Sequence, residues 1–158
     1  MPEMPAKPEI VELSSSDTHA LRRAVLRDGD PTRTVVYPED DLADTVHLGI
    51  RDGDGTLVAT SSWTPKPLDA FAGRRAIQLR GMAIAAGMQG AGVGGRLFET
   101  AVTRWTAAGY ELVWARARDS ALNFYAKHGC TVVGDGFVDD TTRLPHHVVV
   151  RELAPRSD

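Results

Sequence analysis

One stretch of sequence decides the fold of this chain: AIQLRGMAI at residues 76–84, followed after two residues by GMQGAGVGG at residues 87–95. The first segment predicts a strand, in which Gly81 marks a bulge or a close approach of backbone. The second segment is a glycine-rich turn. Apolar residues then recur at helical spacing up to Gly109, namely Val93, Leu97, Phe98, Ala101, Val102 and Trp105. The stretch therefore predicts a strand, a glycine turn and an amphipathic helix in succession.

The glycine turn is also a candidate site for an anion. A helix N-terminus exposes unpaired N–H groups and the positive end of the helix dipole. Glycines allow a phosphate to come close to that backbone. Four of the six residues from Gly90 to Gly95 are glycine, which is more than a plain strand-to-helix turn needs. The sequence therefore favours a phosphate-bearing ligand over a turn without a ligand.

Two other phosphate-binding patterns fit this turn less well. Gly90, Gly92 and Gly95 satisfy the dinucleotide pattern G-x-G-x-x-G, and Glu111 follows about 20 residues later. However, about 90 residues precede the turn, whereas dinucleotide glycines usually follow the first strand of their domain, and Glu111 would open a strand rather than end one. A dinucleotide-dependent oxidoreductase is therefore a minor alternative. A Walker A loop is excluded, because residues 95–97 are Gly-Arg-Leu rather than Gly-Lys-Ser/Thr.

The elements on either side of this stretch follow a mixed order. Before it, the patterns predict strands at residues 10–13, 46–50 and 57–63, a helix ending at Gly29 and a hairpin turn at 52–55. After it, they predict a strand at 112–115, a helix ending at Gly129 and strands at 131–133, 136–138 and 147–153. Residues 30–44 are predicted as loop or a short helix, and Arg22, Arg23 and Arg27 as a solvated helix face. This order predicts an α+β, or mixed α/β, domain with one central sheet.

Composition narrows the classes of protein. The 158 residues include 18 Lys and Arg against 21 Asp and Glu, a net charge of −3, which argues against bulk electrostatic binding of nucleic acid. The single cysteine, Cys130, excludes an internal disulfide and a cysteine-based zinc cluster and fits a reducing cytoplasm. We expect no signal peptide and no membrane-spanning helix. We expect residues 1–8 to be a disordered tail and residues 9–155 to form a single domain.

Two blocks of sequence resemble a known enzyme family. Residues 89–94, QGAGVG, match the pattern Q-x-x-G-x-G, and residues 121–129, ALNFYAKHG, are similar to A-x-x-F-Y-x-x-x-G. In this order and at this spacing, the blocks resemble the GNAT superfamily of N-acetyltransferases, and the resemblance covers residues 76–138. It implies a single-domain fold whose central mixed sheet is flanked by helices. It also implies that two parallel strands, at residues 77–84 and 112–116, splay apart to hold acetyl-CoA.

The resemblance implies direct transfer of an acetyl group from acetyl-CoA, as co-substrate, to an amine, without a metal. Backbone N–H groups of the turn would hold the pyrophosphate. Those of the strand would pair with the pantetheine arm and point at the thioester oxygen, where a fixed donor lowers the barrier. The implied contacts are Met82, Ala83, Ile84, Gln89, Gly90, Ala91, Gly92, Val93, Gly94, Gly95, Arg118 and Asn123. Tyr125 would be the general acid, because a phenol with an ordinary pKa of about 10 can protonate the departing thiolate.

The base that deprotonates the amine is not evident in the same stretch. Many members of the family carry a carboxylate near this strand, but no Asp or Glu occurs between residues 76 and 98. His146 is the leading candidate, because histidine has a suitable pKa, and Asp139 and Asp140 are weaker ones. A residue elsewhere that acts through water, or bulk solvent, is an open alternative. Cys130 is expected to be a small core residue.

The main alternative function is a non-catalytic module that binds CoA or acyl-CoA. The absent strand carboxylate favours it, and Tyr125 counts against it. The sequence names neither the acceptor amine, on a small molecule or a peptide, nor the length of the acyl group. The resemblance leaves a homodimer open. Residues 30–44, 64–75 and 134–147 are expected to line the acceptor pocket, and their mixed charges favour neither a polycationic nor an anionic acceptor.

Overall fold

The computed structural model describes residues 9–153. The predicted tail at residues 1–8 and the last two residues of the predicted domain, 154–155, lie outside the described residues. The strands are β1 (Ile10–Leu13), β2 (Val46–Arg51), β3 (Leu57–Pro65), β4 (Ala76–Ile84), β5 (Leu112–Arg118), β6 (Thr131–Val138) and β7 (Pro145–Glu152). The α-helices are α1 (His19–Leu26), α2 (Val93–Ala107) and α3 (Leu122–Lys127).

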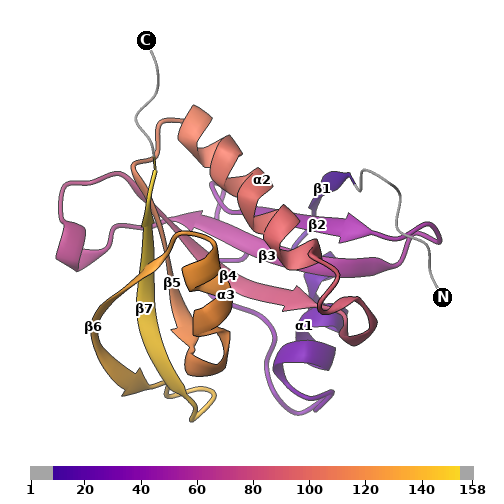
Figure 1. Cartoon of the computed structure of the whole chain (residues 1–158). Helices are drawn as coiled ribbons and strands as arrows, with labels where there is room; N and C mark the ends of the chain where they lie inside the picture. The colour runs from indigo at the N-terminus through magenta and orange to yellow at the C-terminus, as the bar shows by residue number, and fades with distance from the viewer. Residues whose placement is uncertain (1–8, 154–158) are drawn as a thin grey trace. The chain divides into compact units, whose positions relative to one another are not determined.

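The strands follow the order β1-β2-β3-β4-β5-β7-β6 in the sheet (Figure 1). β4 and β5 pair in parallel, from Ala76 opposite Leu112 to Leu79 opposite Ala115. The pairs β1–β2, β2–β3, β5–β7 and β6–β7 are antiparallel. These pairings confirm the predicted α+β fold with a central mixed sheet.

The described chain falls into two compact units. The first comprises residues 9–64 and 80–101, and the second comprises residues 65–79 and 102–153. The boundaries lie inside β4 and inside α2, so each unit holds one part of both elements.

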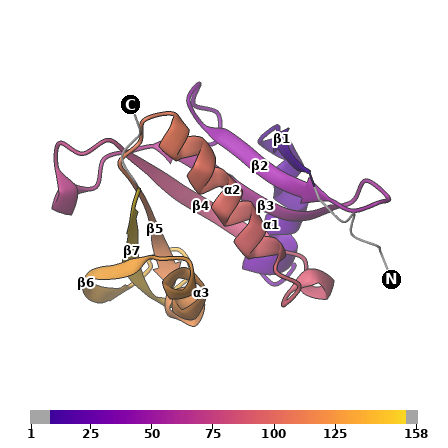
Figure 2. The same ribbon diagram turned by 45° about the horizontal axis from the view of Figure 1, so that its top comes forward.

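In the first unit, α1 and the beginning of α2 cover opposite faces of the hairpin β2–β3 (Figures 1 and 2). Neighbouring residues of a strand point to opposite faces. Ser62 accepts a hydrogen bond from Arg22 of α1, whereas the ring of Trp63 lies 6.1 Å from that of Phe98 of α2. Because both faces are covered, the middle of β3 is buried throughout.

The predicted solvated face of α1 is wrong for two of its three arginines. Arg22 is fully buried and Arg27 is 5% exposed. The guanidinium of Arg27 donates to the carbonyl of Thr34, and that of Arg23 to the carbonyls of Asp30 and Arg33. Residues 30–44 form turns without α-helix or strand. The arginines are buried because the carbonyls of this loop need donors that a regular element would otherwise supply.

In the second unit, β7 lies between β5 and β6. The core of this unit contains a buried cluster of Ala76, Leu112, Trp114 and Val150. The partly buried side chains of Leu68, Phe71, Val133 and Val148 pack against this cluster. The two predicted strands at 131–133 and 136–138 are one strand, β6. Its register with β7 shifts between Val133 opposite Val148 and Phe137 opposite His146, so residues 134–136 bulge opposite His147.

Candidate active site

The glycine turn of the first unit presents open backbone at the start of α2. A short 3₁₀ helix, Ala86–Met88, leads from β4 into the turn. Gly90 and Gly92 have φ values of +84° and +78°, in the left-handed region that favours glycine. A Cβ at either position would have no heavy atom within 4 Å. The turn therefore leaves room for a ligand directly against its backbone.

Charge and anchoring also suit an anion at this turn. The first turn of α2 contains no acidic residue, so nothing there offsets the positive end of the helix dipole. The side-chain amide of Gln89 donates to the carbonyl of Ile84 over 3.1 Å and ties the turn to the end of β4. The arrangement can bind a phosphate through backbone N–H groups.

The part of β4 in the first unit departs from a regular strand at Gly81. Its φ is +62°, and a Cβ there would lie 3.0 Å from both the Nε of Arg22 and the Cε2 of Tyr37. The predicted close approach at this glycine is therefore present. Beyond it, Met82 and Ile84 are half-buried and Ala83 is buried.

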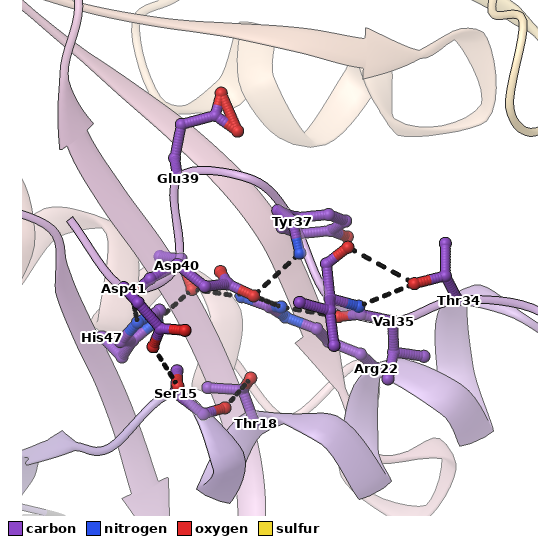
Figure 3. Close-up of polar contacts among 12 residues, drawn as sticks. Ser15, Thr18, Arg22, Thr34, Val35, Tyr37, Glu39, Asp40, Asp41 and His47 are labelled. Atoms are coloured by element: carbon purple, nitrogen blue, oxygen red, sulfur yellow. Dashed lines mark hydrogen bonds and ion pairs between the residues drawn. The ribbon is translucent and has the colours of Figure 1, made fainter.

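Arg22 and Tyr37, which lie against Gly81, belong to a buried polar network. Figure 3 shows this network around Arg22 and Asp40. The guanidinium of Arg22 donates to both carboxylate oxygens of Asp40, at 2.8 and 2.9 Å, and to the Val35 carbonyl and the Ser62 hydroxyl, each at 2.7 Å. Its plane covers the ring of Tyr37, 4.2 Å from the centroid. Burial would raise the pKa of Asp40, but the bonds from Arg22 and from the Tyr37 N–H outweigh it and lower that pKa.

Hydrogen bonding fixes the tautomer of His47 in the same network. Its Nε2 lies 3.0 Å from the Asp40 carbonyl, which can only accept, so Nε2 carries the proton. Its Nδ1 lies 2.6 Å from the Ser62 hydroxyl. Since that hydroxyl already accepts from Arg22, it donates to Nδ1. The network thus locks the loop around Asp40 onto α1, β2 and β3.

In the second unit, Tyr125 lies on α3 and is 7% exposed. Burial raises the pKa of its phenol, and the nearby Cys130 raises it further. The hydroxyl therefore keeps its proton throughout the neutral range, as a general acid must. Cys130 is buried, as expected of a core residue.

His146 lies on β7 and is 5% exposed. Its Nδ1 lies 2.9 Å from the carbonyl of Leu144, so Nδ1 donates and Nε2 is the basic nitrogen of the neutral ring. The ring stacks on Phe137 at 5.8 Å. Arg118, half-buried at the end of β5, lies opposite His146 in the sheet register.

The two candidate catalytic residues belong to opposite faces of the second unit's sheet. His147, next to His146, points to the other face, where its Nδ1 lies 2.6 Å from the carboxylate of Asp119, just before α3. Arg151, on the same face as His147, donates to the carbonyl of His128 at the end of α3. The helix α3, which carries Tyr125, therefore packs on the sheet face opposite to the one to which His146 points.

The weaker base candidates differ in their surroundings. The carboxylate of Asp139 accepts from the N–H groups of Thr141 and Thr142 and pairs with Arg116 at 3.2 Å. Burial opposes these contacts, but together with His146 they lower the pKa of Asp139. Asp139 therefore holds its turn together, whereas Asp140 is exposed. Asn123 is exposed on α3.

Comparison with known proteins decides the family. The model of the GNAT acetyltransferase domain matches residues 35–131. The N-acetyltransferase YitI of Bacillus subtilis, itself uncharacterized, is 30% identical over 142 residues, which cover 90% of this chain and 93% of YitI. The chain belongs to the GNAT acetyltransferase family.

Solved structures of other proteins share this fold. Escherichia coli ElaA has a TM-score of 0.72 at 21% identity, covering 92% of this chain and 100% of ElaA. An aminoglycoside 6'-N-acetyltransferase complexed with coenzyme A has a TM-score of 0.72 at 12% identity, covering 95% and 99% of the two chains. The family makes this GNAT chain an acyltransferase with N-acetyltransferase activity, and confirms the resemblance seen in its sequence.

Sequence reasoning missed the polar network of this GNAT protein and the Asp119–His147 pair. The acidic run at residues 39–41 was visible, but nothing local showed that its members face different partners.

Residues 9–153 contain no group of three or more His, Cys, Asp and Glu arranged to hold a metal ion. Among these residues no helix is long and apolar enough to cross a membrane.

Proposed function

We propose that this GNAT enzyme transfers the acetyl group of acetyl-CoA directly to an amine of a small molecule or peptide. The observation that carries the proposal is the open glycine turn at the start of α2. Gly90 and Gly92 adopt left-handed conformations there and have no neighbour where a side chain would stand.

In this proposal, the backbone of Gln89, Gly90, Ala91, Gly92, Val93, Gly94 and Gly95 holds the pyrophosphate of acetyl-CoA. The backbone of Met82, Ala83 and Ile84, after the irregular Gly81, pairs with the pantetheine arm. One N–H of this segment points at the thioester oxygen and stabilises the oxyanion that forms during attack. Arg118 and Asn123 supply further contacts to the co-substrate.

Tyr125 protonates the departing thiolate as general acid. The phenol is protonated at neutral pH, as this role requires, and its ordinary pKa of about 10 is enough for that. Burial raises this pKa and so makes the phenol a weaker acid. His146 was the sequence candidate for the base, and its Nε2 is the basic nitrogen of the neutral ring. Its side chain belongs to the sheet face opposite α3, which carries Tyr125. The enzyme is proposed to be cytoplasmic, and a homodimer is compatible with its family.

A thermal-shift titration with acetyl-CoA, free CoA and NAD(P)H tests the co-substrate. A ligand at 100 times its dissociation constant stabilises the folded chain by about 2.7 kcal/mol. We expect a shift with acetyl-CoA and CoA and none with NAD(P)H. A chain that shifts with neither CoA species would contradict both the transferase and the CoA-binding alternative. A chain that binds acetyl-CoA but never releases free CoA in the presence of amines would favour the non-catalytic alternative.

A further inference from the structure

The acidic run at residues 39–41 divides among three different neighbours. Asp40 is buried against Arg22, and Asp41 accepts a hydrogen bond from Ser15. Glu39 instead pairs with Arg80 of β4, with 3.5 Å between its Oε2 and the arginine Nη2. In Figure 3 the Glu39 side chain points away from the Arg22–Asp40 pair, on the far side of its loop. The Glu39 side chain therefore faces another partner than the Arg22–Asp40 pair.

The backbone around Glu39 is fixed on both sides. Tyr37 to Asp40 form a turn closed by the Asp40 N–H on the Tyr37 carbonyl at 3.0 Å, and Pro38 occupies the position that favours such turns. The Tyr37 N–H donates back to the Asp40 carboxylate. The Glu39 carbonyl accepts from the Thr45 hydroxyl at 2.6 Å and from the Leu42 N–H at 3.2 Å. The turn thus presents the Glu39 side chain from a rigid base.

This turn lies against the irregular segment of β4. Tyr37 approaches Gly81 so closely that a Cβ there would lie 3.0 Å from its ring, and Arg80 is the residue before Gly81. The side chain of Glu39 is 16% exposed, with its Oε1 buried, and that of Arg80 is 28% exposed. The segment just after Gly81 is the one proposed above to hold the thioester. The first unit therefore pairs a carboxylate with Arg80, two residues before the segment where acetyl transfer is proposed.

We propose that Glu39 binds the ammonium group of a cationic amine acceptor and takes the proton that this nitrogen must lose. The inference rests on the proposed acetyl transfer. It supplies, from a loop distant in sequence, the carboxylate that residues 76–98 lack. Arg80 holds the carboxylate beside β4 until the ammonium arrives.

The ammonium gives one proton to the Glu39 carboxylate, and its freed lone pair forms the C–N bond to the thioester carbonyl carbon. The C–S bond breaks, and its electron pair leaves with sulfur, which takes a proton from the general acid. The second proton lost by nitrogen restores that acid. The products are an N-acetylated amine and CoA, and the proton on Glu39 passes to solvent.

The test compares kcat/KM for amines of different charge. Acetyl transfer from acetyl-CoA at neutral pH is measured with benzylamine, spermidine and L-lysine, whose amino groups are cationic. It is also measured with aniline and 4-aminobenzoate, whose amino groups are uncharged. The wild type should acetylate at least one cation. Glu39→Gln should lower kcat/KM for that cation by about 100-fold or more, the usual contribution of a general base. The increase in Tm that acetyl-CoA causes should be the same in Glu39→Gln as in the wild type. Glu39→Asp should restore part of the activity.

Two further variants separate this role from a structural one. Glu111→Gln removes a carboxylate that pairs with Arg74 at 3.3 Å in the second unit, and should keep wild-type kcat/KM. Arg80→Gln removes the ion pair but keeps the Glu39 carboxylate, and should retain more activity toward cations than Glu39→Gln. If the pair served only the fold, Arg80→Gln and Glu39→Gln would lower Tm alike and neither would distinguish cationic from uncharged amines.

Three results would overturn the inference. The first is an equal kcat/KM for Glu39→Gln and Glu111→Gln. The second is a wild type that acetylates only the uncharged amines. The third is a wild type that binds acetyl-CoA but acetylates no amine of the series. Failure of the wild type to shift with acetyl-CoA, recorded before any amine is added, would instead contradict the proposed function.

Discussion

At the scale of single residues, Arg22 shows why the burial of a cation cannot be predicted from helical periodicity. Helical periodicity assigns arginine to the solvated face, yet this side chain is fully buried. Its guanidinium finds four acceptors, two of them on Asp40, 18 positions further along the chain. A buried charge is tolerated only when it is paired and hydrogen-bonded. The partner here is distant in sequence, so no local pattern could reveal it.

The variant Asp40→Asn should therefore destabilise the fold strongly. It keeps the shape of the side chain but leaves the Arg22 charge buried without its counter-charge. Breaking a buried ion pair in this way costs about 3–5 kcal/mol of unfolding free energy. Urea denaturation measures the change. The control is Asp41→Asn, an exposed neighbour, which should stay within about 0.5 kcal/mol of wild type. Equal stability of the two variants would show that the pair contributes little.

The same pair predicts a dependence on acidity. The pKa of Asp40 lies below its ordinary value of 3.8 in the folded chain. A lowered carboxyl pKa gives stability that is fully present above the unfolded value and is lost as pH falls through the folded one. The stability difference between wild type and Asp40→Asn should thus be constant above about pH 5 and shrink below pH 3.8. Unfolding curves recorded at several pH values test this, and a difference that does not shrink contradicts it.

Tyr125 carries the prediction for catalysis at this scale. Tyr125→Phe removes only the hydroxyl, so the buried ring still packs at 5.2 Å from Phe124. If the phenol protonates the thiolate, kcat should fall by about 100-fold, while the dissociation constant of acetyl-CoA stays the same. Steady-state kinetics and a thermal-shift titration measure the two quantities. Unchanged kcat would remove Tyr125 from the proposed mechanism.

At the scale of elements, the sequence was a good guide where glycine and apolar periodicity mark the ends. The strand at residues 76–84 has the predicted bounds, and α2 begins at the predicted Val93. The prediction was less good for β6, where the bulge at residues 134–136 divided one strand into two predicted ones. A bulge interrupts the alternation on which strand prediction depends. The structure of residues 30–44 could not be predicted from a local pattern, because side chains of α1 and β3 hold this loop in place.

The glycine turn provides the prediction at this scale. Gly92→Ala should weaken acetyl-CoA binding, because the methyl group would occupy the open backbone. It should also cost about 1–2 kcal/mol of stability, because alanine is strained at the φ of +78°. Gly55→Ala, at a φ of +83° in the β2–β3 turn, carries the same strain away from the site. Gly87→Ala, with open space and no positive φ, carries neither effect. Equal acetyl-CoA affinity in all three variants would contradict a pyrophosphate site at the turn.

At the scale of the whole molecule, the family was readable from two blocks of sequence, but most of the site's side chains were not. The co-substrate is indicated by the turn at residues 89–94 and the segment at 121–129, because backbone recognition needs glycines at fixed spacing. Acceptor recognition depends on side chains from loops. Glu39, two residues after Tyr37 in an irregular segment, became visible only through its distance to Arg80.

The most direct test of the central claim is product analysis with the wild-type chain. Acetyl-CoA is incubated with each cationic amine, and free CoA and acetylated amine are quantified by a thiol assay and by mass spectrometry. Both products should form in equal amounts, and only when enzyme and amine are present together. Release of CoA without an acetylated amine, or at the same rate without any amine, would contradict acetyl transfer to nitrogen as the function of this protein.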